Sequence, residues 1–435
     1  MGFLRSVSRF QREERGAAAL LFAGASVPLM LILVATTDYV RASNYRAAMQ
    51  TAVDSAAITL ARSPTSLTDA QLQARGRQVF DAMVKQAGGY ATATFTAART
   101  GQSISVNATG VVQSSFGSFL KPEIGISAQA VVAAGKRKIE LSLALDNTGS
   151  MGQSNKIVEL KKAVVNLLDT MQKLNDAEPG SVKVALVPFT TQVKLGKSYA
   201  NTAWVRFHDN GAAGTAAEKA AWNGCIMDRD QPQNVSDTDP TGSAWSRWHP
   251  IAYQGRSPRN VDWNGPCNSL QQVTPLTADL KSTGAGSLRA AVSAMQANGN
   301  TNVSIGVAWG LKPLMNRAPF SGAAAPGDND VIKAMIVLTD GDNTEDRWSG
   351  SQSAIDARTR STCDMAKDAV KNAAPSAAAD SYVRLYTIRV IQGNRSLLQD
   401  CAGNGGGYSE VSQASQLNDV FQGIVNQILR VRLTS

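Results

Sequence analysis

Oxygen-bearing side chains follow an apolar run near residue 140 and recur at two later points of the chain. A strand is predicted over residues 139–145, and three such side chains follow it at a spacing of two: Asp146, Thr148 and Ser150. Mg²⁺ takes oxygen ligands in octahedral geometry and keeps several waters, so this turn is part of a hard-cation site. Thr301, after a Gly-Asn turn, and Asp340, at the end of a second apolar strand, are the candidates for the remaining ligands. The donor set predicts Mg²⁺, or another divalent cation such as Mn²⁺ or Ca²⁺.

These five residues match, position by position, the metal-ion-dependent adhesion site of von Willebrand factor A domains. That family has Asp-x-Ser-x-Ser, then a Thr after a Gly-rich turn, then Thr-Asp-Gly. Thr148 stands where the family most often has Ser, which keeps the hydroxyl and adds a methyl group. The resemblance implies that a bound ion captures a carboxylate of a protein partner and that chelation abolishes this capture. A degenerate site that keeps only the fold is the alternative.

Apolar strands alternate with amphipathic helices over residues 137–435, which we interpret as the A-type domain. Such alternation predicts a doubly wound α/β fold, with a mostly parallel sheet and helices on both of its faces. Ligands of these sheets bind beyond the carboxyl ends of the strands, where Asp146 and Asp340 fall. Sequence pattern and site chemistry therefore agree.

The alternation stops over residues 196–274, which we treat as an insertion. It holds five of the seven tryptophans: Trp204, Trp222, Trp245, Trp248 and Trp263. One interpretation is a small subdomain that is closed by a disulfide and buries its tryptophan rings in a core of its own. The other is an exposed contact for a protein or glycan, since Trp is enriched at interface hot spots.

The even number of cysteines is typical of an exported protein with disulfides. Four cysteines allow three pairings, and we expect the sequential one because each pair brackets one local unit: Cys225 with Cys267, and Cys363 with Cys401. No two of them form a Cys-x-x-Cys pair, which argues against a thiolate metal site.

The N-terminal residues predict a single membrane span. Residues 1–15 carry four arginines, and residues 16–37 then run without a charge, long enough to cross a hydrocarbon core of about 30 Å. Arginines on the N-terminal side place that end in the cytoplasm. We therefore expect a single-pass protein of the bacterial inner membrane with its bulk in the periplasm, from which it could also reach the cell surface. A cleaved signal peptide and a buried core helix are the alternatives.

Residues 38–136 are expected to continue the helix, add a second helix and end in strand-like runs, which is the plan of pilin-like subunits. The phrases Arg15-Gly-Ala-Ala-Ala-Leu-Leu-Phe-Ala and Met49-Gln-Thr-Ala-Val-Asp-Ser-Ala-Ala resemble the N-terminal signature of TadG and TadE-like proteins. These proteins belong to the tight-adherence (Flp) pilus system. The resemblance implies a role in pilus assembly.

Charge and motif content exclude other classes of function. The formal net charge is +9, but no basic block with interleaved aromatics occurs, so no nucleic-acid partner is expected. No base stands beside the candidate ligands in sequence, and we expect the nearest acids, Asp342 and Glu345, to be solvated. We therefore expect no enzyme but a membrane-anchored pilus-assembly or adhesion component that binds a protein partner through its metal. The alternatives are a structural scaffold with a dispensable ion and an envelope metallohydrolase whose catalytic residues converge from distant segments.

Overall fold

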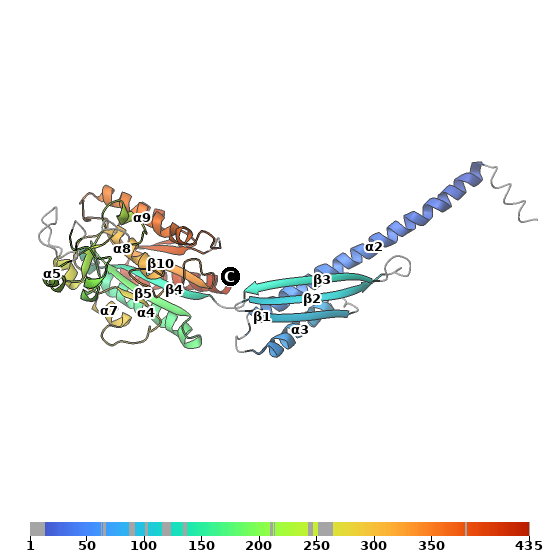
Figure 1. Ribbon diagram of the computed structural model, residues 1–435, viewed down its shortest axis with the longest axis horizontal. Helices are drawn as coiled ribbons and strands as arrows, with labels where there is room; N and C mark the ends of the chain where they lie inside the picture. The colour runs from blue at the N-terminus through green and yellow to red at the C-terminus, as the bar shows by residue number, and fades with distance from the viewer. Residues whose placement is uncertain are drawn as a thin grey trace, which may run out of the picture. The chain divides into compact units, whose positions relative to one another are not determined.

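The chain divides into two compact units, Met1–Gly135 and Lys136–Ser435. The structure is a computed structural model, shown in Figure 1. It describes residues 14–434 except 62, 64–66, 87–91, 101–102, 115–122, 134–136, 209–211, 213, 242–246, 251–263 and 379–380. The predicted cytoplasmic segment, residues 1–15, lies almost entirely outside the described residues.

The first unit packs one long helix and one short helix against an antiparallel sheet. Its elements are α2 (Glu14–Ala61), α3 (Asp69–Gln86), β1 (Thr92–Thr100), β2 (Ser103–Gln113) and β3 (Glu123–Ala133), with the sheet in the order β1-β2-β3. Small alanines of α2, such as Ala52 and Ala56, are fully buried, which lets the helix lie close to the strands. The expected order of helix, helix and strands is therefore present.

Large apolar side chains of α2 between residues 21 and 33 are exposed within their unit, where their placement is described. Leu21, Phe22 and Leu33 are 75%, 77% and 71% exposed. By length and composition the helix is able to cross a membrane, a property that a signal sequence near an N-terminus shares. A core helix would instead bury these side chains. Pro28 lies inside the helix, which membrane helices tolerate.

The second unit is built on a nine-stranded sheet in the order β12-β11-β10-β4-β5-β6-β7-β8, with β9 also paired to β5. The strands are β4 (Lys138–Asp146), β5 (Val182–Phe189), β6 (Val193–Lys194), β7 (Cys225–Met227), β8 (His249–Pro250), β9 (Thr274–Thr277), β10 (Val331–Thr339), β11 (Val383–Val390) and β12 (Tyr408–Val411). The pairs from β12 to β5 are parallel, whereas β6, β7, β8 and β9 pair in antiparallel fashion.

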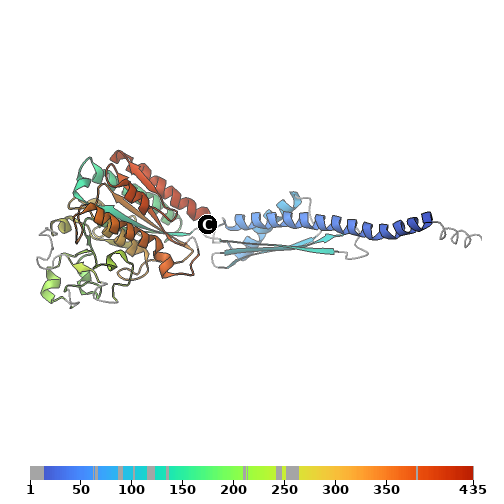
Figure 2. The same cartoon turned by 90° about the horizontal axis from the view of Figure 1, so that it is seen from above.

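Helices cover both faces of this sheet (Figures 1 and 2). One face packs on α4 (Lys156–Ala177), α7 (Leu288–Ala294) and α11 (Leu417–Thr434), and the other on α8 (Val303–Leu311), α9 (Gln352–Ala373) and α10 (Arg395–Cys401). In β4, Leu143 and Leu145 belong to the core between the sheet and α4, α7 and α11. Ala144 belongs to the core on the opposite face, with α8, α9 and α10. The prediction of a mixed α/β fold with a mostly parallel central sheet is confirmed.

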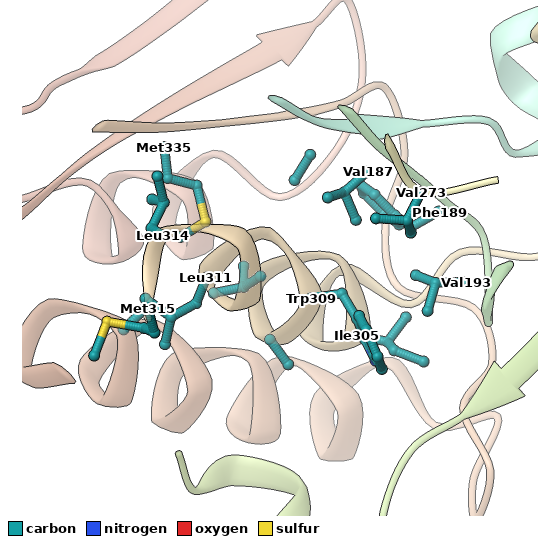
Figure 3. Close-up of a cluster of buried hydrophobic side chains, with 14 of the residues drawn as sticks. Val187, Phe189, Val193, Val273, Ile305, Trp309, Leu311, Leu314, Met315 and Met335 are labelled. Atoms are coloured by element: carbon teal, nitrogen blue, oxygen red, sulfur yellow. The ribbon is translucent and has the colours of Figure 1, made fainter. Parts of the chain in front are cut away.

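The insertion does not form a separate subdomain, which was one of the two interpretations of its sequence. Its short strands β6, β7 and β8 extend the main sheet, and Trp204, Trp222 and Trp248 are buried in the core that α8 shares with β5. Figure 3 shows part of that core, with Trp309 and Ile305 of α8 among the side chains of β5. The Trp248 and Trp309 ring centroids are 4.6 Å apart. Trp245 and Trp263 lie outside the described residues.

The first half of helix α9 is buried largely through polar side chains. Ile355 is buried there together with polar side chains such as Asp356 and Thr359. Apolar periodicity does not reveal a helix whose buried face is polar, because the pattern relies on hydrophobic spacing.

Candidate functional site

Strand β4 ends at Asp146, and the hydrogen bonds of this residue fix its carboxylate at the edge of the sheet. Asp146 is fully buried. Its Oδ1 accepts a hydrogen bond from the backbone N–H of Thr148 at 2.7 Å, and its Oδ2 accepts one from Thr339 Oγ1 at 2.6 Å. Both carboxylate oxygens are therefore held in place by the ends of two neighbouring parallel strands, β4 and β10.

The two hydroxyls after Asp146 lie on one side of a single turn. This turn is η1 (Gly149–Gly152), and Thr148 Oγ1 lies 3.1 Å from Ser150 Oγ. Ser150 Oγ donates a hydrogen bond to Asp340 Oδ1 at 2.6 Å. The ends of β4 and β10 thus bring Thr148, Ser150 and Asp340 into one cluster.

Thr301 reaches the same cluster from the loop before α8. Its backbone N–H donates to Thr344 Oγ1 at 2.8 Å, and Thr344 N–H donates back to Thr301 O at 3.0 Å. A Cβ placed on Gly341 would lie 3.4 Å from Ser150 Oγ and 3.5 Å from Thr301 Oγ1. Both hydroxyls therefore flank one small space beside Gly341, so all five predicted ligand residues lie around one point.

The two carboxylates at this point, Asp146 and Asp340, are both fully buried. Burial, and after it the negative charge of Asp340, raise the pKa of Asp146 from 3.8 to about 7, against hydrogen bonds from Thr339 and Thr148 that lower it. A buried carboxylate next to a second one is unfavourable unless a positive charge compensates. The arrangement therefore fits a divalent cation.

The donor chemistry also favours a hard cation. The five residues offer only carboxylate and hydroxyl oxygens, the ligands that suit Mg²⁺, Mn²⁺ and Ca²⁺. Among the described residues no group of three or more His, Cys, Asp or Glu side chains is arranged to hold a metal. The site thus depends on its hydroxyls as much as on its two carboxylates.

Lys156 is a member of the cluster that the sequence analysis missed. Its side chain is 2% exposed, and its Nζ lies 2.7 Å from Asp340 Oδ2. The residue occupies the first position of α4, where the helix dipole disfavours a cation. A lysine at this unfavourable position was the one feature of the sequence that could have pointed to a specific partner for Lys156. With Lys156 and both carboxylates ionised, the cluster keeps one net negative charge.

Of the two neighbouring acids, only one behaves as expected. Asp342 is exposed, but Glu345 is 6% exposed and accepts a hydrogen bond from Asn300 Nδ2 at 2.6 Å. The expectation of a solvated Glu345 was wrong, because the loop after β10 folds back on the loop that carries Thr301. Glu345 therefore helps to hold that loop.

Both expected disulfides are present, with the sequential pairing. Cys225 is bonded to Cys267, and Cys363 is bonded to Cys401. The first bridge joins β7 to α6 (Asn264–Ser269) inside the insertion, and the second joins α9 to α10. The described residues contain no free cysteine.

Comparisons with known proteins gave structural likenesses only. No protein-family model matches the chain. No curated protein matches it either. Among solved structures, the open conformation of the pilus adhesin SpaC from Lactobacillus rhamnosus GG matches over 78% of this chain with 13% identity and a TM-score of 0.38. The chain spans 34% of that adhesin.

Two further likenesses are of the same order. The minor pilin PilB from Streptococcus sanguinis matches over 78% of each chain, with 13% identity and a TM-score of 0.36. Mussel byssus proximal thread matrix protein 1, in a structure with a zinc-occupied MIDAS motif, matches over 68% of this chain and 48% of its own, with 13% identity and a TM-score of 0.30. Scores of this size do not establish a shared fold or function, so the function of this chain has to be inferred from its own site.

Proposed function

We propose that the chain is a membrane-anchored pilus-assembly or adhesion component, similar to TadG-like proteins of the Flp system, whose second unit is a von Willebrand factor A-like domain. The observation that carries the proposal is the convergence of Asp146, Thr148, Ser150, Thr301 and Asp340 around one point beside Gly341. These residues come from three segments that are distant in the sequence. A set of local turn hydrogen bonds does not require such convergence.

The site residues would hold Mg²⁺, Mn²⁺ or Ca²⁺, and the bound ion would supply an open coordination position for a carboxylate of a protein partner. The surroundings of the site favour binding over catalysis. Asp146 Oδ2 accepts a hydrogen bond from Thr339 Oγ1, and Glu345 Oε2 accepts one from Asn300 Nδ2, so both carboxylates hold the loops of the site in place. We therefore propose a binding protein and not an enzyme.

Membrane anchoring is supported by α2. Apolar side chains such as Leu21, Phe22 and Leu33 are exposed in their own unit. The hydroxyls of Ser26, Thr36 and Thr37 donate to carbonyls of the same helix. A helix whose polar groups are satisfied internally suits a bilayer. The arginines before the apolar run favour a cytoplasmic N-terminus, with the residues after the span in the periplasm.

The test is capture of envelope proteins by the tagged full-length protein in detergent, in Mg²⁺ and in EDTA. We expect a partner that is retained in Mg²⁺, released by EDTA and absent when Asp146→Ala is used as bait. Lys162→Met, which changes an exposed residue of α4, is the matched control and should capture as the wild type does. Equal capture in all conditions would exclude a metal-bridged partner.

A structural scaffold is the second candidate, and Lys156 favours it. Because this ammonium group already lies against Asp340, part of the site's charge is balanced without an ion. If the chain is a scaffold, the Asp146→Ala protein should still support pilus assembly in cells, whereas a protein that lacks residues 16–62 should not. Loss of assembly with Asp146→Ala, in protein that is still folded, would exclude the scaffold function.

A further inference from the structure

The loop that carries Thr301 lies between two parts of the insertion. We define this segment, residues 298–302, as the Thr301 loop. At its first end, Asn298 Nδ2 donates to Ser269 Oγ at 3.1 Å. The next residue, Gly299, has a φ of +94°, and a Cβ there would lie 2.8 Å from Pro266 Cβ. Helix α6 is therefore packed directly against the start of the loop.

The other end of the loop is held by Asp228, just after β7. Asn302 Nδ2 donates to Asp228 Oδ2 at 2.8 Å, and both side chains are buried. Arg347, on the loop after β10, donates to Asp228 O at 3.2 Å and to Asp230 Oδ1 at 2.6 Å. The same part of the insertion thus contacts two of the loops around the candidate metal site.

One covalent bond connects these two contacts. The Cys225–Cys267 disulfide joins β7 to α6. Cys225 lies three residues before Asp228, and α6 contacts Asn298 and Gly299. The loop in turn touches the hydroxyl turn, because Gly149 N–H donates to Gly299 O at 2.9 Å. A shift of α6 relative to β7 would therefore displace Thr301 and the turn that carries Thr148 and Ser150.

We propose that the disulfide-closed insertion is a positioning element for the metal site, with Asp228 as its principal contact to the Thr301 loop. The inference rests on the proposed metal-binding function and adds a role for the insertion. Residues that orient metal ligands through hydrogen bonds change metal affinity by about 10- to 100-fold when they are replaced. The insertion acts on the ion through Asn302 and Gly299, without contributing a ligand.

The test measures Mn²⁺ binding to the full-length protein in detergent through loss of the free-ion electron paramagnetic resonance signal. We expect Cys225→Ser/Cys267→Ser to weaken Mn²⁺ binding at least tenfold. The matched control, Cys363→Ser/Cys401→Ser, removes the other bridge and should leave the Mn²⁺ affinity within about threefold of wild type, even though both double variants lose thermal stability.

A second variant pair keeps the test decisive if the first disulfide variant does not fold. Asp228→Ala removes the oxygen that accepts from Asn302 and should weaken Mn²⁺ binding about tenfold, whereas Asp228→Asn keeps that acceptor and should restore most of the affinity. Asp228→Ala protein that binds Mn²⁺ as tightly as wild type would overturn the positioning role alone. Wild-type protein that binds no Mn²⁺ would overturn the metal site itself, and the inference with it.

Discussion

Replacing Lys156 with methionine tests how the site balances its charges. Methionine has a similar length and volume but no charge, so Lys156→Met leaves Asp340 buried beside Asp146 without its cation. Breaking a buried ion pair by removing one partner costs about 3–5 kcal/mol. For a unit of this size we expect the metal-free protein to unfold roughly 10 °C lower.

Divalent cations should reverse most of this loss. Without the ammonium group the site has a larger negative charge and binds the ion more tightly, and an ion at 1,000 times its Kd stabilises the folded state by about 4.1 kcal/mol. The expected result is therefore a larger rise in Tm on addition of Mg²⁺ for Lys156→Met than for wild type.

Differential scanning calorimetry of the full-length protein, with EDTA and with a Mg²⁺ series, provides the measurement. Lys162→Met, an exposed lysine on the same helix, should change neither Tm nor its response to Mg²⁺. A loss of Tm in Lys156→Met that is the same with and without Mg²⁺ would refute the reasoning, because it would show that Lys156 and the ion do not act on the same carboxylate.

Four further predictions concern the same unit. Because the pKa of Asp146 is raised to about 7, a proton competes with the ion below that pH, so Mn²⁺ binding followed by paramagnetic resonance should be roughly 100-fold weaker at pH 5 than at pH 8. For the same reason the metal-free protein should lose stability as the pH rises from about 4 to 7, since only the folded state holds this proton there; a flat profile in calorimetry would contradict the shift. Thr148→Ser should keep Mn²⁺ affinity within about threefold, whereas Thr148→Val, which lacks the hydroxyl, should weaken it at least tenfold; equal affinities would remove Thr148 from the ligand set. Phe421→Ala, which truncates a buried side chain of α11, should lower the free energy of unfolding in denaturant by about 3–5 kcal/mol. It should leave the Mn²⁺ affinity unchanged, which separates stability from site geometry.

Much of the central sheet could be predicted because several of its strands are apolar runs, two of which lead directly to an acid. Asp146 and Asp340 follow β4 and β10 directly, and parallel strands carry their ends to one edge, so their proximity follows from the pattern. The strands of the insertion could not be predicted in this way. Those of two or three residues, such as β7, are too short to show a period. They form because β6 pairs with the edge of β5, and β7 and β8 then extend the sheet in turn.

The residues that support the site were harder to foresee than the ligands. Lys156, Glu345 and Asp228 are charged, and charged side chains in a sequence are usually solvated. Each is buried here because a specific partner, respectively Asp340, Asn300 and Asn302, reaches it from a distant segment. Such pairs depend on the fold and leave no local spacing that a sequence pattern detects.

Five oxygen-bearing residues are proposed to hold one divalent ion beside Gly341. The most direct measurement is anomalous diffraction at the manganese edge from crystals of the full-length protein grown with Mn²⁺. We predict one strong peak among Asp146, Thr148, Ser150, Thr301 and Asp340, with the Lys156 ammonium group separate from it. A map without a peak at this point, in protein whose five side chains are ordered, would contradict the claim.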